Sequence, residues 1–176
     1  GKDNRAHVHS MLKYPAVMVP NMQGEIFDIL LKNDNTIHNV LDPFMGSGTI
    51  LVEGMIRGLD ACGVDINPLS YLLVLVKTQN YSLGILQSKS KELIERKDCF
   101  SFEGINKWYN DEIIVQLSRI RRCIIEEPDI RYRRLFWVTF AEIAKQSDNS
   151  RTSTFKLHIK EQEDIDNWEY DCVEKF

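Results

Sequence analysis

The chain has 176 residues, of which 43% are hydrophobic, and its 22 basic and 26 acidic side chains give a formal charge of −4. This length and apolar content suit one globular domain with a short appendage and exclude wholesale disorder. The longest apolar run, residues 71–76, is far shorter than the roughly 20 residues that cross a bilayer. No membrane partner is therefore expected.

Cysteine usage is consistent with a reducing, cytoplasmic setting. The cysteines are scattered and form no Cys-x-x-Cys pair, so neither a disulfide framework nor a cysteine zinc site is expected. The histidines share no ligand spacing, and no metal is assigned. The mild acidity argues against a general nucleic-acid coat protein but permits a local basic patch.

The first 36 residues predict an extended arm followed by a helix. Pro15 and Pro20 restrict the backbone around them to extended conformations. Asn21 is expected to cap the helix that follows. Four apolar side chains recur there at helical spacing, namely Met22, Ile26, Ile29 and Leu30.

Residues 37–78 predict a strand, a glycine turn, a helix, a second strand and a second helix. The first strand is expected over 39–42 and the second over 61–66, with helical periodicity at 49–57 between them. Asn67 and Pro68 are expected to cap and open the next helix. This order indicates a βαβ unit with a parallel sheet.

The character of the sequence changes after Tyr81. Residues 84–98 are charged and helical, 111–127 carry an apolar stripe, and a helix is expected from Pro128 to about Ser147. The tail from Lys160 is polar and acidic and is expected to be poorly ordered. We therefore predict a core over residues 1–81 and a helical extension and tail over residues 82–176.

The turn after the first strand places carboxylates where ligands of open α/β folds bind, at the carboxyl edge of the sheet. Gly46 and Gly48 allow a sharp turn and a close approach of a ligand to the backbone. Asp42 can accept a hydrogen bond from a cationic or amino group. Asp65, 17 residues past Gly48, stands where an acidic side chain accepts two ribose hydroxyls of an adenosine ligand.

Three kinds of nucleotide site compete for this turn. A Walker loop needs Gly-Lys-Ser/Thr, and no lysine follows Gly48, which excludes ATP or GTP hydrolysis. A dinucleotide site needs a small residue where Leu51 stands. S-adenosylmethionine (SAM) has no phosphate, and its sulfonium and amino groups suit the carboxylate of Asp42. An ordinary βα turn in another α/β protein is the remaining alternative.

The run at residues 40–49, Val-Leu-Asp-Pro-Phe-Met-Gly-Ser-Gly-Thr, resembles motif I of the amino-group DNA methyltransferases, which modify adenine N6 or cytosine N4. Residues 63–68 resemble the ribose-binding motif II, and residues 14–20 resemble motif X, which closes over the methionine end of SAM. The resemblance covers residues 7–80 well and the rest loosely. It implies an α/β fold, a partial Rossmann-like SAM-dependent methyltransferase sheet with a mostly helical extension.

The resemblance also implies a role for each matching residue. Asp42 and the glycine-turn backbone would hold the methionine portion of SAM, Asp65 the ribose, and Ile66 would flank the adenine. A surface-hugging arm is the alternative for Tyr14 and Pro15. The implied cofactor-binding residues are Tyr14, Pro15, Ala16, Asp42, Pro43, Phe44, Gly46, Ser47, Gly48, Thr49, Asp65, Ile66 and Asn67.

The family's catalytic motif, Asp/Asn/Ser-Pro-Pro followed by an aromatic residue, is absent, because none of the 5 prolines are adjacent. That motif accepts the hydrogens of the exocyclic amine and stacks on the flipped base, so no catalytic residue is assigned. We interpret the chain as the SAM-binding part of a DNA methyltransferase, truncated or split, inactive alone and most simply part of restriction-modification. A catalytic half or partner subunit is expected, as is self-association through exposed sheet edges.

Arginines in the helical part give a candidate DNA surface, since phosphate contacts supply much of the affinity for DNA. Such a run is more often a solvated face, here balanced by Glu126, Glu127 and Asp129. The candidates are Arg131, Arg133, Arg134 and Arg151.

Two other functions remain open. Some tRNA guanine-N2 methyltransferases have a very similar turn, although the RNA-binding module expected upstream is missing here. The absent Pro-Pro motif favours the second, a non-catalytic SAM-binding subunit that supports a partner. The sequence specifies neither the base, nor the recognition sequence, nor whether the chain is a truncation.

Overall fold

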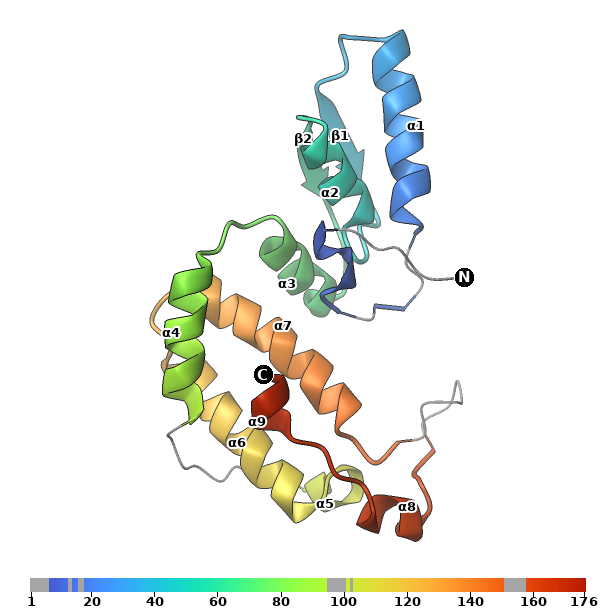
Figure 1. The fold of residues 1–176 in the computed structure, drawn as a ribbon. Helices are drawn as coiled ribbons and strands as arrows, with labels where there is room; N and C mark the ends of the chain where they lie inside the picture. The colour runs from blue at the N-terminus through green and yellow to red at the C-terminus, as the bar shows by residue number, and fades with distance from the viewer. Residues whose placement is uncertain (1–6, 13, 16–17, 95–100, 102, 151–157) are drawn as a thin grey trace. The chain divides into compact units, whose positions relative to one another are not determined.

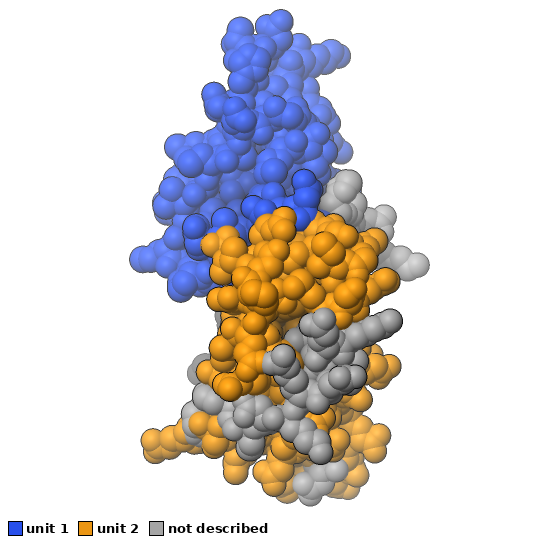
Figure 2. All heavy atoms as spheres, turned by 90° about the vertical axis from the view of Figure 1, so that its left-hand side faces the viewer, with its two compact units in different colours: residues 1–80 blue, residues 81–176 orange. Residues whose placement is uncertain are grey.

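The computed structural model describes residues 7–12, 14–15, 18–94, 101, 103–150 and 158–176. The chain divides into two compact units, residues 1–80 and residues 81–176, which are coloured separately in Figure 2. Among the described residues, the first unit holds the named β-strands and the second is built from helices. No described helix combines the length and apolarity that a bilayer span requires.

The first unit runs through η1 (His7–Ser10), α1 (Pro20–Asn33), β1 (Asn39–Asp42), α2 (Thr49–Ile56), β2 (Asp60–Gly63) and α3 (Pro68–Lys77) (Figure 1). The two strands pair in parallel, with Asn39 opposite Asp60 and Asp42 opposite Gly63. The predicted βαβ unit is confirmed, with α2 as its crossover. The second strand ends three residues earlier than predicted, at Gly63.

The first residues of two helices show what fixes their starts. As predicted, Asn67 caps α3, its Oδ1 accepting the backbone N–H of Leu69 at 3.0 Å. The predicted cap of α1 is wrong: α1 begins at Pro20, and the capping position belongs to Val19, which makes no side-chain capping bond. Proline suits the first helical position because its φ is already helical and it needs no partner for an N–H.

The sheet is covered by α2 on one face only, within the part of the chain that the structure describes. A Cβ on Gly54 of α2 would lie 2.9 Å from Cγ1 of Val40, so helix and strand are in close contact there. On the other face, Leu41 is 65% exposed and Cys62 is exposed. Parallel sheets are normally buried on both faces. The described residues thus form a two-stranded parallel sheet that has one uncovered face.

Helix α1 adds a second apolar surface. Its buried residues are Pro20, Gly24 and Phe27, and it packs beside α2. The predicted helical stripe is present but faces outward, with Met22, Ile26, Ile29 and Leu30 all exposed. The periodicity therefore predicted the helix correctly. It did not predict which face of the helix is buried against the other described residues.

The second unit contains α4 (Leu83–Ile94), α5 (Ile105–Trp108), α6 (Asp111–Glu126), α7 (Ile130–Gln146), α8 (Gln162–Asp166) and α9 (Cys172–Lys175). The apolar stripe of α6 is buried as predicted and includes Ile113, Leu117 and Ile124. Helix α7 begins two residues after Pro128, because the side chain of Asp129 accepts the backbone N–H of Arg131 at 2.9 Å and caps it.

The expectation of a poorly ordered tail is wrong for the described residues from Lys160 onward. Cys172 is fully buried in one core with residues of α6 and α7. Its backbone N–H donates to Oε1 of Gln116 at 2.6 Å, and Asp171 caps α9 by accepting two backbone N–H groups. These contacts fix the polar tail, although its composition carries no sign of them.

Candidate cofactor-binding site

The turn between β1 and α2 is closed by backbone hydrogen bonds to the end of β2. Met45 donates to the carbonyl of Val64 at 3.0 Å, and Val64 donates to the carbonyl of Asp42 at 2.9 Å. Gly46 and Gly48 have φ values of 48° and 76°, which side chains disfavour. A Cβ on Gly48 would also lie 2.6 Å from Cγ2 of Val74. Glycine at position 48 is thus required by both conformation and space.

Asp42 presents an unused acceptor at this turn. The residue is 8% exposed, and its Oδ1 accepts the backbone N–H of Phe44 at 3.0 Å. Its Oδ2 is buried and has no hydrogen-bond partner among the described residues. A buried carboxylate oxygen without a donor is costly. A ligand that brings an ammonium or amino group to Oδ2 removes that cost.

Asp65 binds the same turn from the end of the second strand. Its Oδ1 accepts the backbone N–H of Asn67 and its Oδ2 that of Gly46, both at 2.8 Å. These hydrogen bonds, that from Asn67 first, hold the pKa of Asp65 below its usual value. The side chain is therefore an ionised carboxylate at neutral pH. An ionised carboxylate only accepts hydrogen bonds, which is what a ligand hydroxyl requires.

Two buried side chains of α3, which sequence reasoning missed, support the turn from the other side. The hydroxyl of Ser70 donates to the carbonyl of Gly46, and Nζ of Lys77 donates to that of Ser47 at 2.8 Å. Ser70 and Lys77 are seven positions apart, and that spacing puts both on one helix face. Polar residues on an otherwise apolar helix face were the signal that could have identified them.

Tyr14 reaches this turn from the arm. Its hydroxyl accepts a hydrogen bond from Nδ2 of Asn67 at 2.9 Å. Its ring atom Cε1 lies 3.8 Å from the position of a Cβ on Gly46. The structure thus brings together Tyr14, Gly46 and Asn67, which are distant in sequence. Pro15 is exposed, and Ala16 lies outside the described residues.

The remaining predicted residues divide into exposed and buried groups. Phe44 is 84% and Ile66 100% exposed, and Pro43 is also exposed. Ser47 and Thr49 are buried, with their hydroxyl oxygens 3.2 Å apart. The exposed apolar side chains could cover a ligand, while the two hydroxyls lie inside the turn.

The predicted arginine surface is partly occupied by contacts within the chain. Arg131 forms an ion pair with Asp129 at 2.9 Å, and hydrogen bonds from Arg131 lower the pKa of Asp129 to about 2. Nε of Arg133 donates to the carbonyl of Glu127 at 2.7 Å. Arg151 lies outside the described residues. This geometry suits the solvated helix face that the sequence left as an alternative.

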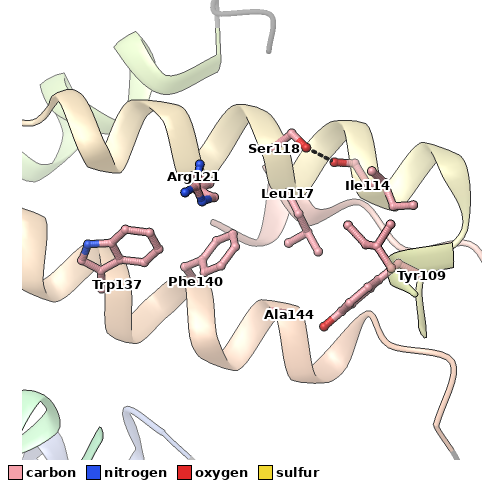
Figure 3. A pocket seen from close by; sticks show the side chains of 9 residues that line it. Tyr109, Ile114, Leu117, Ser118, Arg121, Trp137, Phe140 and Ala144 are labelled. Atoms are coloured by element: carbon pink, nitrogen blue, oxygen red, sulfur yellow. Dashed lines mark hydrogen bonds between the residues drawn. The ribbon is translucent and has the colours of Figure 1, made fainter. Parts of the chain in front are cut away.

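The second unit contains a separate cavity of about 210 Å³ between α6 and α7 (Figure 3). Trp137 and Phe140 project into it from α7, with ring centroids 5.5 Å apart and rings nearly perpendicular. Leu117 and Arg121 line it from α6. None of the cofactor-binding residues predicted from the sequence lines this cavity.

Comparison with known proteins gives two curated relatives. The chain is 30% identical over 178 residues to the Type II methyltransferase M.MvaI from Kocuria varians, which covers 93% of this chain and 39% of that protein. It is 30% identical over 119 residues to the Type II methyltransferase M.MjaII from Methanocaldococcus jannaschii, which covers 68% of this chain and 21% of that protein. No family model and no solved structure matches the chain.

The chain therefore spans less than half the length of the curated relatives that it matches. The similarity to M.MvaI nonetheless covers both units, since it extends over 93% of the chain. Both of these homologues are Type II methyltransferases.

Proposed function

We propose that this chain is the SAM-binding part of a DNA amino-methyltransferase that acts on adenine N6 or cytosine N4 in restriction-modification. The observation that carries the proposal is the buried, unpartnered Oδ2 of Asp42 beside the glycine turn. The two Type II methyltransferase homologues support the reaction class.

The chemistry of the site fits SAM better than a phosphate ligand. Asp42 and Asp65 bring two carboxylates to the turn, which attract the amino group of SAM and repel phosphate, while the ammonium of Lys77 donates to the carbonyl of Ser47. In this proposal Asp42 binds that amino group, and Phe44 forms a wall of the same pocket. Asp65 accepts the ribose hydroxyls, and Ile66 flanks the adenine. SAM, when bound, supplies the methyl group that is transferred. Tyr14, through its contact with Asn67, covers the methionine side.

The catalytic motif comes, in this proposal, from a segment or partner other than these 176 residues. The sequence contains no Pro-Pro pair, and the relatives are more than twice as long as the matched regions. The uncovered sheet face at Leu41 and Cys62 and the exposed stripe of α1 are surfaces on which such a catalytic part could pack. The chain alone is then inactive.

Calorimetric titration of the 176-residue chain with SAM, ATP and NAD tests the cofactor. SAM should bind, and the two phosphate-containing ligands should not. Preferential binding of ATP or NAD would show that the assignment of the glycine turn is wrong. Absence of binding to all three ligands would contradict the proposed function.

A non-catalytic SAM-binding subunit is the second candidate, and the absence of a Pro-Pro pair is the observation that favours it. The two candidates differ in a reconstitution experiment with radiolabelled SAM. A split enzyme should methylate DNA only when this chain is mixed with a polypeptide that carries the Pro-Pro motif and has no activity of its own. A supporting subunit should instead raise the rate of a partner that is already active. RNA in place of DNA in the same assay tests the nucleic-acid class.

A further inference from the structure

The N-terminal arm, residues 8–12 and 14–15, is attached to the rest of the first unit by a buried polar contact outside the predicted cofactor-binding residues. Nε2 of His9 lies 2.9 Å from Oε1 of Glu53 in α2. The exposed fractions of the two residues are 2% and 7%. Oε2 of Glu53 also accepts from Arg57 at 2.7 Å, and Arg57 pairs with Asp28 of α1 at 2.6 Å. One set of contacts thus joins the arm, α2 and α1.

The contact between His9 and Glu53, which we call the anchor, lies at one end of the arm. From there the arm leads to the glycine turn. Leu12 is buried, and its carbonyl accepts the backbone N–H of Tyr14 at 2.9 Å. Tyr14 then lies against Gly46 and binds Asn67. His9 and Tyr14 are five positions apart, and five steps of the backbone span at most about 18 Å when fully extended. The position of the anchor therefore restricts where the Tyr14 ring can lie.

The chemistry of the anchor favours positioning over stability. A buried ionisable pair often contributes no more to stability than apolar groups of the same volume, because both partners lose hydration. A hydrogen bond between an imidazole and a carboxylate does, however, fix direction and distance. Fixed geometry is needed where a short arm must present one ring to a ligand site.

We propose that His9 is a positioning residue for the cofactor: through Glu53 it holds the arm so that Tyr14 covers the methionine side of the site at Gly46. This inference rests on the proposed function. It assigns a role to a residue outside every cofactor-binding segment predicted from the sequence.

The test compares SAM with 5′-methylthioadenosine, which keeps the adenosine but lacks the methionine amino and carboxyl groups. His9→Leu removes the hydrogen bond while keeping an apolar side chain of similar size. It should weaken SAM binding about tenfold, the equivalent of one lost hydrogen bond, and change methylthioadenosine binding less than about twofold. His9→Gln, which can still donate to Glu53, should restore SAM affinity. Asp28→Asn breaks the outer end of the same network and serves as the matched control, with both affinities unchanged.

Two results would overturn the inference. The first is an unchanged SAM affinity in His9→Leu. The second is an equal loss of affinity for SAM and for methylthioadenosine, which would indicate a role in stability alone. Failure of the proposed function looks different, since the wild-type chain would then bind neither ligand. Should His9→Leu not fold, Glu53→Gln replaces the charged acceptor with a neutral one of the same size. It should weaken SAM binding about threefold, which in free energy is half the effect expected when the hydrogen bond is lost completely. The affinity for methylthioadenosine should again stay unchanged.

Discussion

The carboxylate of Asp65 accepts the backbone N–H of Gly46 across 2.8 Å and so joins the end of the second strand to the turn that follows the first. The same carboxylate accepts the N–H of Asn67, the cap of α3. The residue proposed to bind the ribose therefore also shapes the backbone on which the rest of the ligand would lie. A substitution at Asp65 acts on both functions, and the ligand must be varied to separate them.

Asp65→Ala should remove the discrimination between adenosine and 2′-deoxyadenosine. The wild-type chain should prefer adenosine by about 10–150-fold, because a hydrogen bond to a charged group contributes about 1.5–3 kcal/mol. Calorimetry with both nucleosides measures the preference in each protein. If the variant keeps the wild-type preference while binding both nucleosides more weakly, Asp65 shapes the turn but does not bind the ribose.

Asp42→Asn should weaken SAM binding about 10–100-fold without loss of stability. The amide oxygen can still accept the N–H of Phe44, but an NH₂ group replaces the unpartnered Oδ2 and opposes the ligand amino group. Because the variant buries no unpaired charge, its free energy of unfolding should equal or exceed that of the wild type. Calorimetry and urea unfolding test the two statements. Equal SAM affinity would show that the amino group binds elsewhere.

Gly48→Ala should destabilise the chain more than Gly58→Ala. Both glycines have φ of 76°, so both variants incur the cost of a left-handed conformation, about 1–2 kcal/mol. A Cβ at position 58 meets no atom within 4 Å, whereas one at position 48 lies 2.6 Å from Cγ2 of Val74. Overpacking adds about 1–3 kcal/mol at position 48. Equal shifts in the urea midpoint would show that α3 moves to accommodate the methyl group.

The second unit should lose stability as the pH rises from about 9 to about 11. Burial raises the pKa of the Cys172 thiol from 9.0 to about 11 and also raises the pKa of Tyr109. In this interval the unfolded chain has already lost protons that the folded chain still holds, so unfolding becomes more favourable with increasing pH. Urea unfolding followed by tryptophan fluorescence reports this unit, because all 3 tryptophans lie in residues 81–176.

Two cysteine variants provide the matched comparison for this pH dependence. Cys172→Ala should reduce the fall in stability with pH, whereas Cys62→Ala, at an exposed thiol of the first unit, should leave it as in the wild type. An identical pH dependence in all three proteins would assign the effect to the tyrosines alone.

Charge reversal of Arg131, Arg133 and Arg134 tests the proposed DNA surface in the reconstituted enzyme. The slope of log K against log salt concentration is negative, and each lost phosphate contact should reduce its magnitude by about 0.9. An unchanged slope would identify these residues as the solvated helix face that the contacts of Arg131 with Asp129 and of Arg133 with the Glu127 carbonyl suggest.

Local patterns were sufficient to predict the βαβ unit, and they also suggest the candidate site. The strand, glycine and cap signals of residues 39–68 act over a few neighbouring residues, and Asp42, Gly46 and Asn67 could be identified from them. The contact of His9 with Glu53 could not, because it joins residues 44 positions apart through folding alone. The outward stripe of α1 shows a related limit: periodicity identifies an apolar face but not what covers it.

The exposure of Phe44 and Ile66 predicts how the enthalpy of SAM binding depends on temperature. Their side chains are 84% and 100% exposed in the free chain, and a SAM molecule that lies against both would remove a large apolar surface from water. Burial of apolar surface lowers the heat capacity, by about 0.45 cal/mol/K per Å². The enthalpy of SAM binding should then become more negative with each degree of warming. A ligand held only by the carboxylates would show the opposite slope.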